Sequence, residues 1–325
     1  MAESISLTLK DWIPYKLSEE NGNALCRWLY LGDAQFSDPF FDESYFKCMS
    51  LPNNSSVFRP VSGVEILPEW SAQIESIPPT AFIFHISRCG STLIAQLLGM
   101  DPSRIVLSEV PFFDEVLLKG FKENVSVSQL LNAAIGFYGA KRNGQHSYLF
   151  IKTDSWHLHY YKQLRELYPR VPFLLLYRRP DEVIRSHQKR RGTQAVPGLI
   201  DPAIFNLSKE GLVNLNMDEY LARVLESYFT SFLEILKADK LAVPFNYNEG
   251  AINIVKKIAG LSGISLNAGD VEAMKVRASF HGKYPGQVFE EPALNVLIPA
   301  YQERVFELYN EVEIMRAVWG KLGQV

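Results

Sequence analysis

Continuous apolar runs alternate with amphipathic helical patterns through the middle of this chain of 325 residues. The runs have the length and composition of strands buried on both faces, and strands are predicted at residues 82–86, 147–151 and 171–177. A helical pattern follows each run, which predicts helices at residues 91–100, 157–167 and 181–190. Strands that alternate with helices predict a parallel sheet with right-handed crossovers, and therefore an α/β fold.

The later part of the chain continues in the same way. A long amphipathic pattern predicts a helix that Asp218 caps and that runs to Lys237. A strand is expected at residues 241–247, and a last helix within residues 294–318.

The segment before the first core strand has a different character. Residues 1–78 are rich in aromatic side chains and carry no motif that we can assign. We therefore expect an N-terminal appendage over residues 1–78, packed on an α/β domain of residues 79–325.

A loop of small residues joins the first core strand to its helix, and residues 87–92 read SRCGST. Such a turn points several backbone N–H groups at one spot, where the helix dipole also favours negative charge. Gly90 lets the backbone approach a ligand closely, and Arg88 adds a guanidinium group that fits phosphate or sulfate oxygens. The residues expected to hold the anion are Arg88, Cys89, Gly90, Ser91 and Thr92.

The order of residues in this loop differs from the ATP- and GTP-binding pattern GxxxxGK[ST]. His85 stands where that pattern has its first glycine, and Ser91 stands where it has lysine. The cation precedes the glycine instead, at Arg88. This order resembles the 5′-phosphosulfate loop of the sulfotransferases, which typically reads Pro-(Lys/Arg)-Ser-Gly-Thr-Thr. Here Ser87 replaces the proline and Cys89 replaces the serine.

A second motif follows the strand expected at residues 171–177. Residues 178–186 read RRPDEVIRS, similar to the Arg-x-Pro-x-(Asp/Glu)-x-x-x-Ser of sulfotransferases. The resemblance implies that Arg178 and Ser186 hold the 3′-phosphate of 3′-phosphoadenosine 5′-phosphosulfate. It also implies a P-loop NTPase-like three-layer α/β/α fold with a central parallel sheet. The expected activity is metal-free transfer of the sulfuryl group from this donor to an acceptor hydroxyl, by in-line displacement.

Two further residues are candidates for the chemistry. Residues 107–114 read LSEVPFFD and resemble the Glu-Val-His-Phe-Phe-Asp stretch of heparan-sulfate glucosaminyl 3-O-sulfotransferases, which implies that Glu109 is the general base. Lys152 stands at the end of a predicted strand, where ligands of open α/β sheets bind. The same family has a Lys-Thr-Pro here, which implies that Lys152 stabilises charge, although Asp154 replaces the proline.

Other residues offer alternatives or additions to this set. His157 and His159 are competing bases, because cytosolic sulfotransferases of small molecules use a histidine. Residues 277–286 read RASFHGKYPG and resemble the late loop that closes over the nucleotide in sulfotransferases. That resemblance implies that Arg277 and Lys283 contact the donor, whereas an ordinary Gly/Pro turn is equally consistent with the segment.

Composition limits the partners. A net charge of −3 and a pI near 6.1 do not favour general nucleic-acid binding. The three cysteines lack metal-ligand spacing, the first residues lack a signal-peptide pattern, and no apolar run approaches the roughly 18 residues of a membrane span. We expect a cytoplasmic enzyme that acts on a small-molecule or carbohydrate acceptor.

Two other functions compete with this interpretation. A P-loop nucleotide kinase or NTPase needs Mg²⁺, and therefore a loop lysine followed by Ser or Thr and an acidic ligand at a strand end. Asp154 is the only carboxylate near the predicted strand ends. The second alternative is a catalytically inactive nucleotide-binding regulator, which the unusual Ser87, Cys89 and Asp154 leave open.

Overall fold

The computed structural model describes residues 8–118, 125–208, 210–280 and 298–322. The strands are β1 (Trp12–Glu20), β2 (Asn23–Tyr30), β3 (Val61–Gly63), β4 (Ala81–His85), β5 (Arg104–Ser108), β6 (Tyr148–Lys152), β7 (Phe173–Tyr177) and β8 (Ala242–Asn246). The α-helices are α1 (Phe41–Met49), α2 (Leu67–Ser71), α3 (Ser91–Leu98), α4 (Pro111–Leu118), α5 (Val127–Tyr138), α6 (Tyr161–Leu167), α7 (Pro180–Lys189), α8 (Met217–Ala238), α9 (Ala251–Leu261), α10 (Ala268–Ala278) and α11 (Glu303–Leu322). None of these described helices is both long and apolar enough to cross a membrane.

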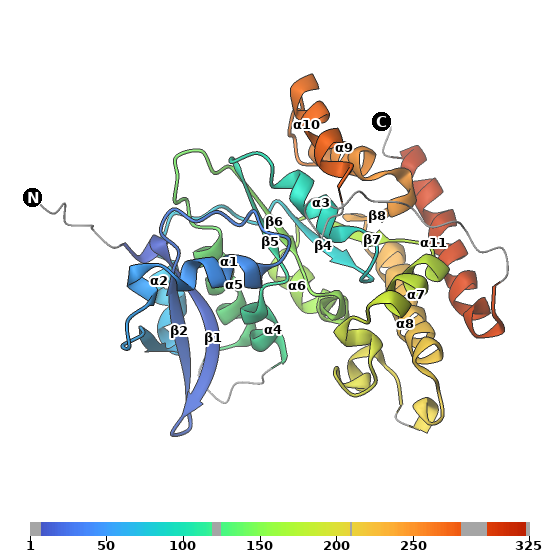
Figure 1. The fold of residues 1–325 in the computed structure, drawn as a ribbon, viewed down its shortest axis with the longest axis horizontal. Coiled ribbons are helices and arrows are strands. Elements are labelled where there is room, and N and C mark those ends of the chain that lie inside the picture. Colours follow the sequence, from blue (N-terminus) through green and yellow to red (C-terminus); the bar gives the residue numbers. More distant parts are fainter. Residues whose placement is uncertain (1–7, 119–124, 209, 281–297, 323–325) are drawn as a thin grey trace, which may run out of the picture. The chain divides into compact units, whose positions relative to one another are not determined.

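The strands from β4 to β8 form one sheet in the order β5-β6-β4-β7-β8 (Figure 1). The pairs β5·β6, β4·β7 and β7·β8 are all parallel. Every residue of β4, β5, β7 and β8 is buried, so both faces of the sheet are covered. The predicted three-layer α/β/α fold with a central parallel sheet is confirmed.

The chain divides into two compact units, each continuous in space but not in sequence. Unit 1 consists of Met1–Thr80, Leu98–Lys152 and Gln163–Pro169. Unit 2 consists of Ala81–Leu97, Thr153–Lys162 and Arg170–Val325. The expected division into an appendage of residues 1–78 and a domain of residues 79–325 stays a prediction.

Unit 1 contains a three-stranded antiparallel sheet in the order β1-β2-β3, which we did not predict from the sequence. Helices α4 and α5 pack on β1 (Figure 1). The Glu115 carboxylate of α4 accepts a hydrogen bond from the backbone N–H of Leu17, at 2.5 Å. The hydroxyl group of Tyr138 in α5 donates to the carbonyl of Pro14, at 2.7 Å. These bonds tie the long β1–β2 hairpin to the helices.

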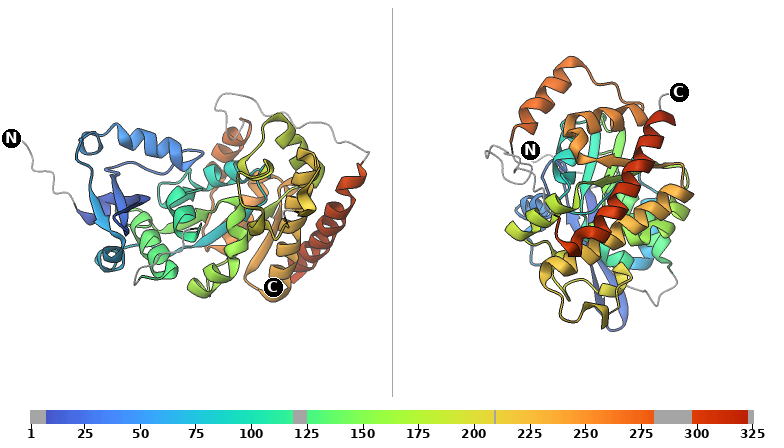
Figure 2. Two further views of the ribbon diagram at one scale, coloured as in Figure 1. Left: turned by 90° about the horizontal axis from the view of Figure 1, so that it is seen from below. Right: turned by 90° about the vertical axis from the view of Figure 1, so that its right-hand side faces the viewer.

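Unit 2 is built on β4, β7 and β8. Helix α8 presents buried aromatic residues such as Tyr228, Phe229 and Phe232, and α11 packs along α8 and β8 (Figures 1 and 2). The predicted cap of α8 was wrong by two residues. Asn216 is the cap, and its side chain accepts hydrogen bonds from the N–H groups of Asp218 and Glu219, at 2.9 and 3.0 Å. Asn is as good a cap as Asp, so either residue fits the pattern.

Candidate functional site

The loop between β4 and α3, in unit 2, has an unusual backbone. Ser87 and Arg88 have φ angles of 60° and 50°, and Gly90 has a φ of 85°. This left-handed conformation costs a non-glycine residue roughly 1–2 kcal/mol. Such strain persists only where the surroundings enforce it, and it concentrates at functional sites.

His85 is one of the groups that hold this loop. Its Nδ1 atom accepts a hydrogen bond from the N–H of Ser87, and its Nε2 atom lies 3.0 Å from the carbonyl of Thr153. Because a carbonyl only accepts, these contacts assign the proton to Nε2 and make His85 a neutral support of the loop. The thiol of Cys89 is fully buried and donates to the carbonyl of Leu176, at 3.4 Å. Cys89 can therefore offer a ligand only its backbone N–H.

Helix α3 begins immediately after this turn. The N–H of Ile94 bonds to the carbonyl of Gly90, at 3.2 Å, so the helical pattern of hydrogen bonds starts at the glycine. The N–H groups before Ile94 lie in the first turn, which provides no carbonyl partners within the helix. Ser91 and Thr92 belong to this turn, and their side chains are almost fully buried. The turn has the features of an anion-binding helix N-terminus.

The neighbouring strands of unit 2 end beside this loop. Arg178 follows β7, and Tyr247 follows β8 and begins the short 3₁₀ turn η8 (Tyr247–Glu249). The guanidinium carbon of Arg178 lies 5.2 Å from the centre of the Tyr247 ring, within the range of a cation–π contact. The same ring lies so close to Gly90 that a Cβ atom there would be 2.0 Å from its Cε2 atom. Gly90, Tyr247 and Arg178 thus form one continuous layer.

Arg88 and Ser186 are related through the end of α7. The guanidinium group of Arg88 donates to the carbonyl of Arg190, the residue that ends α7. The N–H of Arg190 in turn bonds to the carbonyl of Ser186, at 3.3 Å. Arg88 and Ser186 thus both bond to Arg190 at the C-terminal end of α7, whereas Arg178 lies two residues before the start of this helix.

Arg277, the predicted contact of the late loop, lies in the last turn of α10. Its guanidinium group donates to the side chain of Gln96 in α3 and to the carbonyl of Phe280. Burial lowers the pKa of Arg277 from its usual value. Lys283 lies outside the described residues.

Unit 1 brings Glu109 and Lys152 together. Lys152 Nζ lies 2.5 Å from Glu109 Oε1, and the N–H of Glu109 donates to the carbonyl of Lys152, at 2.8 Å. The pair forms because Ser108 and Lys152 are partners in the β5·β6 register. Lys152 is fully buried, with its ammonium 5.6 Å from the centre of the Phe40 ring, whereas the Glu109 side chain is 24% exposed. Glu109 also has a left-handed φ of 55°. It is therefore a strained, partly accessible carboxylate with a buried cation beside it.

The two alternative bases lie in unit 2, in the 3₁₀ segment η4 (Ser155–Tyr160). His157 is buried, with Nε2 3.9 Å from the Asp154 carboxylate. The His159 ring stacks on Tyr228 with 5.6 Å between ring centres, and burial lowers the pKa of His159 to about 4. His159 thus belongs to an aromatic cluster and stays neutral at pH 7.

The role of Tyr247 was not predicted from the sequence. The sequence indicates a strand end followed by a Tyr-Asn-Glu corner at this segment, but the contact with Gly90 depends on the pairing of β4, β7 and β8. In a sequence, such a residue is indicated by an aromatic side chain that directly follows a buried strand.

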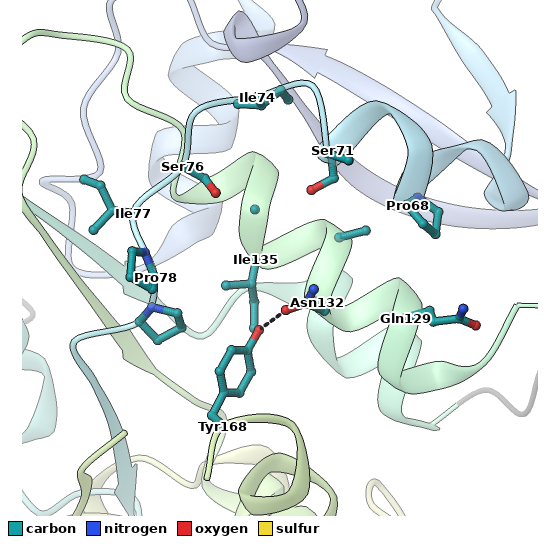
Figure 3. A pocket seen from close by; sticks show the side chains of 14 residues that line it. Pro68, Ser71, Ile74, Ser76, Ile77, Pro78, Gln129, Asn132, Ile135 and Tyr168 are labelled. Carbon is teal, nitrogen blue, oxygen red and sulfur yellow. Dashed lines mark hydrogen bonds between the residues drawn. The ribbon is translucent and has the colours of Figure 1, made fainter. Parts of the chain in front are cut away.

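A pocket of about 430 Å³ lies at α2 and α5 in unit 1 (Figure 3). It is lined by Pro68, Ser71, Ala72, Ile74, Ser76, Ile77, Pro78, Pro79, Gln129, Asn132, Ala133, Ile135, Gly136 and Tyr168. The Tyr168 hydroxyl donates to Asn132 Oδ1, at 3.0 Å. None of the catalytic or donor-binding residues predicted from the sequence lines this pocket.

Searches for related proteins found similarity at the level of structure alone. No family model and no curated protein matches the chain. The sulfotransferase domain from the curacin biosynthetic pathway is similar with a TM-score of 0.48 and 12% identity, over 74% of this chain and 99% of that domain. Sulfotransferase STF9 from Mycobacterium avium gives a TM-score of 0.45 and 14% identity, over 80% of this chain and 79% of the other. Sulfotransferase STF1 from Mycobacterium tuberculosis gives a TM-score of 0.39 and 13% identity, over 72% of this chain and 80% of the other.

Proposed function

We propose that this chain is a sulfotransferase that uses 3′-phosphoadenosine 5′-phosphosulfate as donor and transfers its sulfuryl group to an acceptor hydroxyl. One observation carries the proposal. The neighbouring parallel strands β4, β7 and β8 end in the anion loop, in Arg178 and in Tyr247, and Gly90, the Tyr247 ring and the Arg178 guanidinium pack on one another.

This arrangement suits a ligand with two separate anionic groups. The α3 N-terminus and Arg88 provide one anion position, by backbone N–H groups and a guanidinium. Arg178 provides the second from the adjacent strand, and adjacent strands lie about 4.8 Å apart. The two positions are thus separated by a distance that a single nucleotide spans. A nucleotide with a 5′-phosphosulfate and a 3′-phosphate carries its charges in this way.

The loop does not favour a Mg²⁺-dependent kinase. In such enzymes a lysine follows the last glycine of the loop and reaches the outer phosphates. Here Ser91 holds that position, and its side chain is 4% exposed. The cation, Arg88, comes before the glycine and reaches toward the end of α7.

In the proposed reaction the acceptor oxygen attacks the sulfur atom of the donor in line with the bond to the 5′-phosphate. The new S–O bond forms as the bond to the phosphate oxygen breaks, and 3′-phosphoadenosine 5′-phosphate leaves. Glu109 takes the proton of the acceptor hydroxyl. Arg88 and the loop N–H groups, with Lys152, stabilise the negative charge that develops on the leaving phosphate and the sulfuryl group. Arg178 and Ser186 hold the 3′-phosphate, Arg277 contacts the nucleotide, and the acceptor is a small molecule or a carbohydrate.

Calorimetry of 3′-phosphoadenosine 5′-phosphate without metal, beside ATP with Mg²⁺, tests the proposal. We expect metal-free binding by the wild type and weaker or absent binding of ATP. Arg178→Ala should lose about 10- to 100-fold in affinity, since a hydrogen bond to a charged group contributes about 1.5–3 kcal/mol. Arg179→Ala is the matched control. Both arginines pair with a carboxylate of α7, Arg178 with Glu182 at 2.9 Å and Arg179 with Asp181 at 3.0 Å, but Arg179 lies over Phe306 and not over Tyr247.

Preference for ATP with Mg²⁺, or equal losses in Arg178→Ala and Arg179→Ala, would refute the proposal. Binding without transfer to any acceptor would indicate the nucleotide-binding regulator instead.

A further inference from the structure

A single carboxylate in α11 connects two strands of unit 2 at the ends that face the proposed donor site. Glu313 Oε1 accepts a hydrogen bond from the Tyr177 hydroxyl at 2.5 Å and from Asn246 Nδ2 at 3.0 Å. It also accepts from Arg316 Nε at 3.0 Å, and Glu313 Oε2 accepts from Arg316 Nη2 at 2.8 Å. One side chain thus joins the last residues of β7 and β8 to the last described helix.

The two strand residues bonded to Glu313 directly precede the donor-site residues. Tyr177 is followed by Arg178, and Asn246 is followed by Tyr247. Tyr177 is fully buried and Asn246 is 3% exposed, so neither can exchange Glu313 for water at low cost. The position of Glu313 therefore affects the positions of Arg178 and of the Tyr247 ring.

Arg316 extends the same network to the far end of the turn that carries Tyr247. Its Nη1 atom lies 3.4 Å from Glu249 Oε1, and that same oxygen accepts the N–H of Asn246 at 3.0 Å. Lys257 holds the second oxygen of Glu249. Both ends of η8 are tied to α11, so the Tyr247 ring is fixed against Gly90 from outside the turn.

The charges in this network are consistent with an intact ion pair. Burial opposes ionisation of Glu313, but hydrogen bonds from Arg316, Tyr177 and Asn246 outweigh it, and the net pKa of the carboxyl lies below its usual value of 4.5. The hydrogen bond with Glu313 raises the pKa of Arg316 above its usual value. Burial and the Glu313 bond raise the pKa of Tyr177, which keeps its hydroxyl a donor.

From this geometry we infer that Glu313 and Arg316 are positioning residues for the donor nucleotide, acting through Arg178 and Tyr247. The inference rests on the proposed function and deepens it. It assigns to α11, which supplies no motif of the donor site, control over the affinity for the 3′-phosphate.

The test compares two ligands in metal-free calorimetry: 3′-phosphoadenosine 5′-phosphate, and adenosine 5′-phosphosulfate, which lacks the 3′-phosphate. Glu313→Ala should weaken binding of the first about tenfold and of the second less than twofold. Glu313→Gln keeps an acceptor for Tyr177 and Asn246 and should recover most of the affinity. Glu311→Ala, an exposed position of the same helix, is the control and should bind as the wild type does.

A double variant separates positioning from general destabilisation. If Glu313 acts through Arg178, then Glu313→Ala in an Arg178→Ala background should cause little further loss, since coupled residues are not additive. Equal weakening of both ligands, full additivity, or an unchanged Glu313→Ala would overturn the inference. Should Glu313→Ala fail to fold by circular dichroism, Tyr177→Phe removes one bond only and should show the same ligand selectivity, a few-fold in size.

The outcome also distinguishes this inference from the function on which it rests. A wild-type protein that binds neither ligand refutes both. A wild-type protein that binds, with variants that behave as the wild type does, refutes only the role of α11.

Discussion

Replacing Gly90 by alanine tests the contact on which the proposed donor site depends. The new Cβ atom would lie 2.0 Å from Tyr247 Cε2 and 2.2 Å from Cδ2, whereas carbon atoms in contact stay about 3.5–4.0 Å apart. The ring would have to withdraw by roughly 1.5 Å, and Arg178 lies over that ring. Because η8 is bonded at both ends, the turn cannot follow easily.

Gly198→Ala measures the cost of the left-handed backbone alone, so this cost can be subtracted from the effect of Gly90→Ala. Gly198 has the same φ of 85°, but a Cβ atom there would meet nothing within 4 Å. Gly198→Ala should therefore cost only the strain of the left-handed backbone, about 1 kcal/mol. Gly90→Ala carries this strain and the ring displacement, which we expect to bring the total to about 2–3 kcal/mol, in the range of overpacked cores.

Thermal denaturation and calorimetry of 3′-phosphoadenosine 5′-phosphate measure the two effects. We expect Gly90→Ala to lose about 10- to 100-fold in affinity, equivalent to about 1.4–2.8 kcal/mol, while Gly198→Ala binds as the wild type does. If Gly90→Ala binds within twofold of the wild type, or if both variants lose equally, the layer of Gly90, Tyr247 and Arg178 is not the donor site.

Three further predictions concern Glu109, Lys152 and His159. Glu109→Gln should keep donor binding but lower the transfer rate about 10²- to 10⁴-fold, and an unchanged rate at saturating donor would exclude Glu109 as the base. Lys152→Met should destabilise the protein by about 1–3 kcal/mol in urea unfolding, since it leaves the partly buried Glu109 carboxylate without its partner; an unchanged free energy of unfolding would contradict this. The pKa of His159 is lowered from 6.5 to about 4, so the unfolded chain binds a proton first as the pH falls. Stability should decrease between pH 6.5 and 4 by about 2–3 kcal/mol, and His159→Phe should remove that part of the slope.

The buried strands could be predicted because they consist almost entirely of apolar residues. The apolar runs at residues 82–86 and 171–177 correspond to β4 and β7, displaced by one or two residues at their ends. Strand β5 was missed, since it begins with Arg104 and ends with Ser108. The Arg104 Nη1 and Nη2 atoms donate to the carbonyl of Leu98 and the carboxylate of Asp101, at 3.3 and 3.1 Å, and such compensation is invisible in a pattern of apolar positions.

The candidate site divides in the same way. Residues of the anion loop and of the Arg178 motif are contiguous in sequence, so their grouping could be predicted. The pair of Glu109 and Lys152 could be predicted only as two separate candidates, because the register of β5 and β6 brings them together. Glu313 could not be found, since its bonds reach partners 67 and 136 residues away in the chain. The contact of Tyr247 with Gly90 depends on the order of the strands in the sheet, which the sequence does not show.

The bonds from α11 to the strand ends also set an order of events during synthesis. Translation proceeds from β4 toward α11, at about 5–20 residues per second, and the anion loop leaves the ribosome long before Glu313 and Arg316 do. Until they emerge, the hydroxyl of Tyr177 and the amide of Asn246 lack the Glu313 carboxylate as an acceptor. The turn that carries Tyr247 then also lacks the ion pair between Glu249 and Arg316. Under the proposed function, a nascent chain reaches full affinity for the donor only after α11 has emerged.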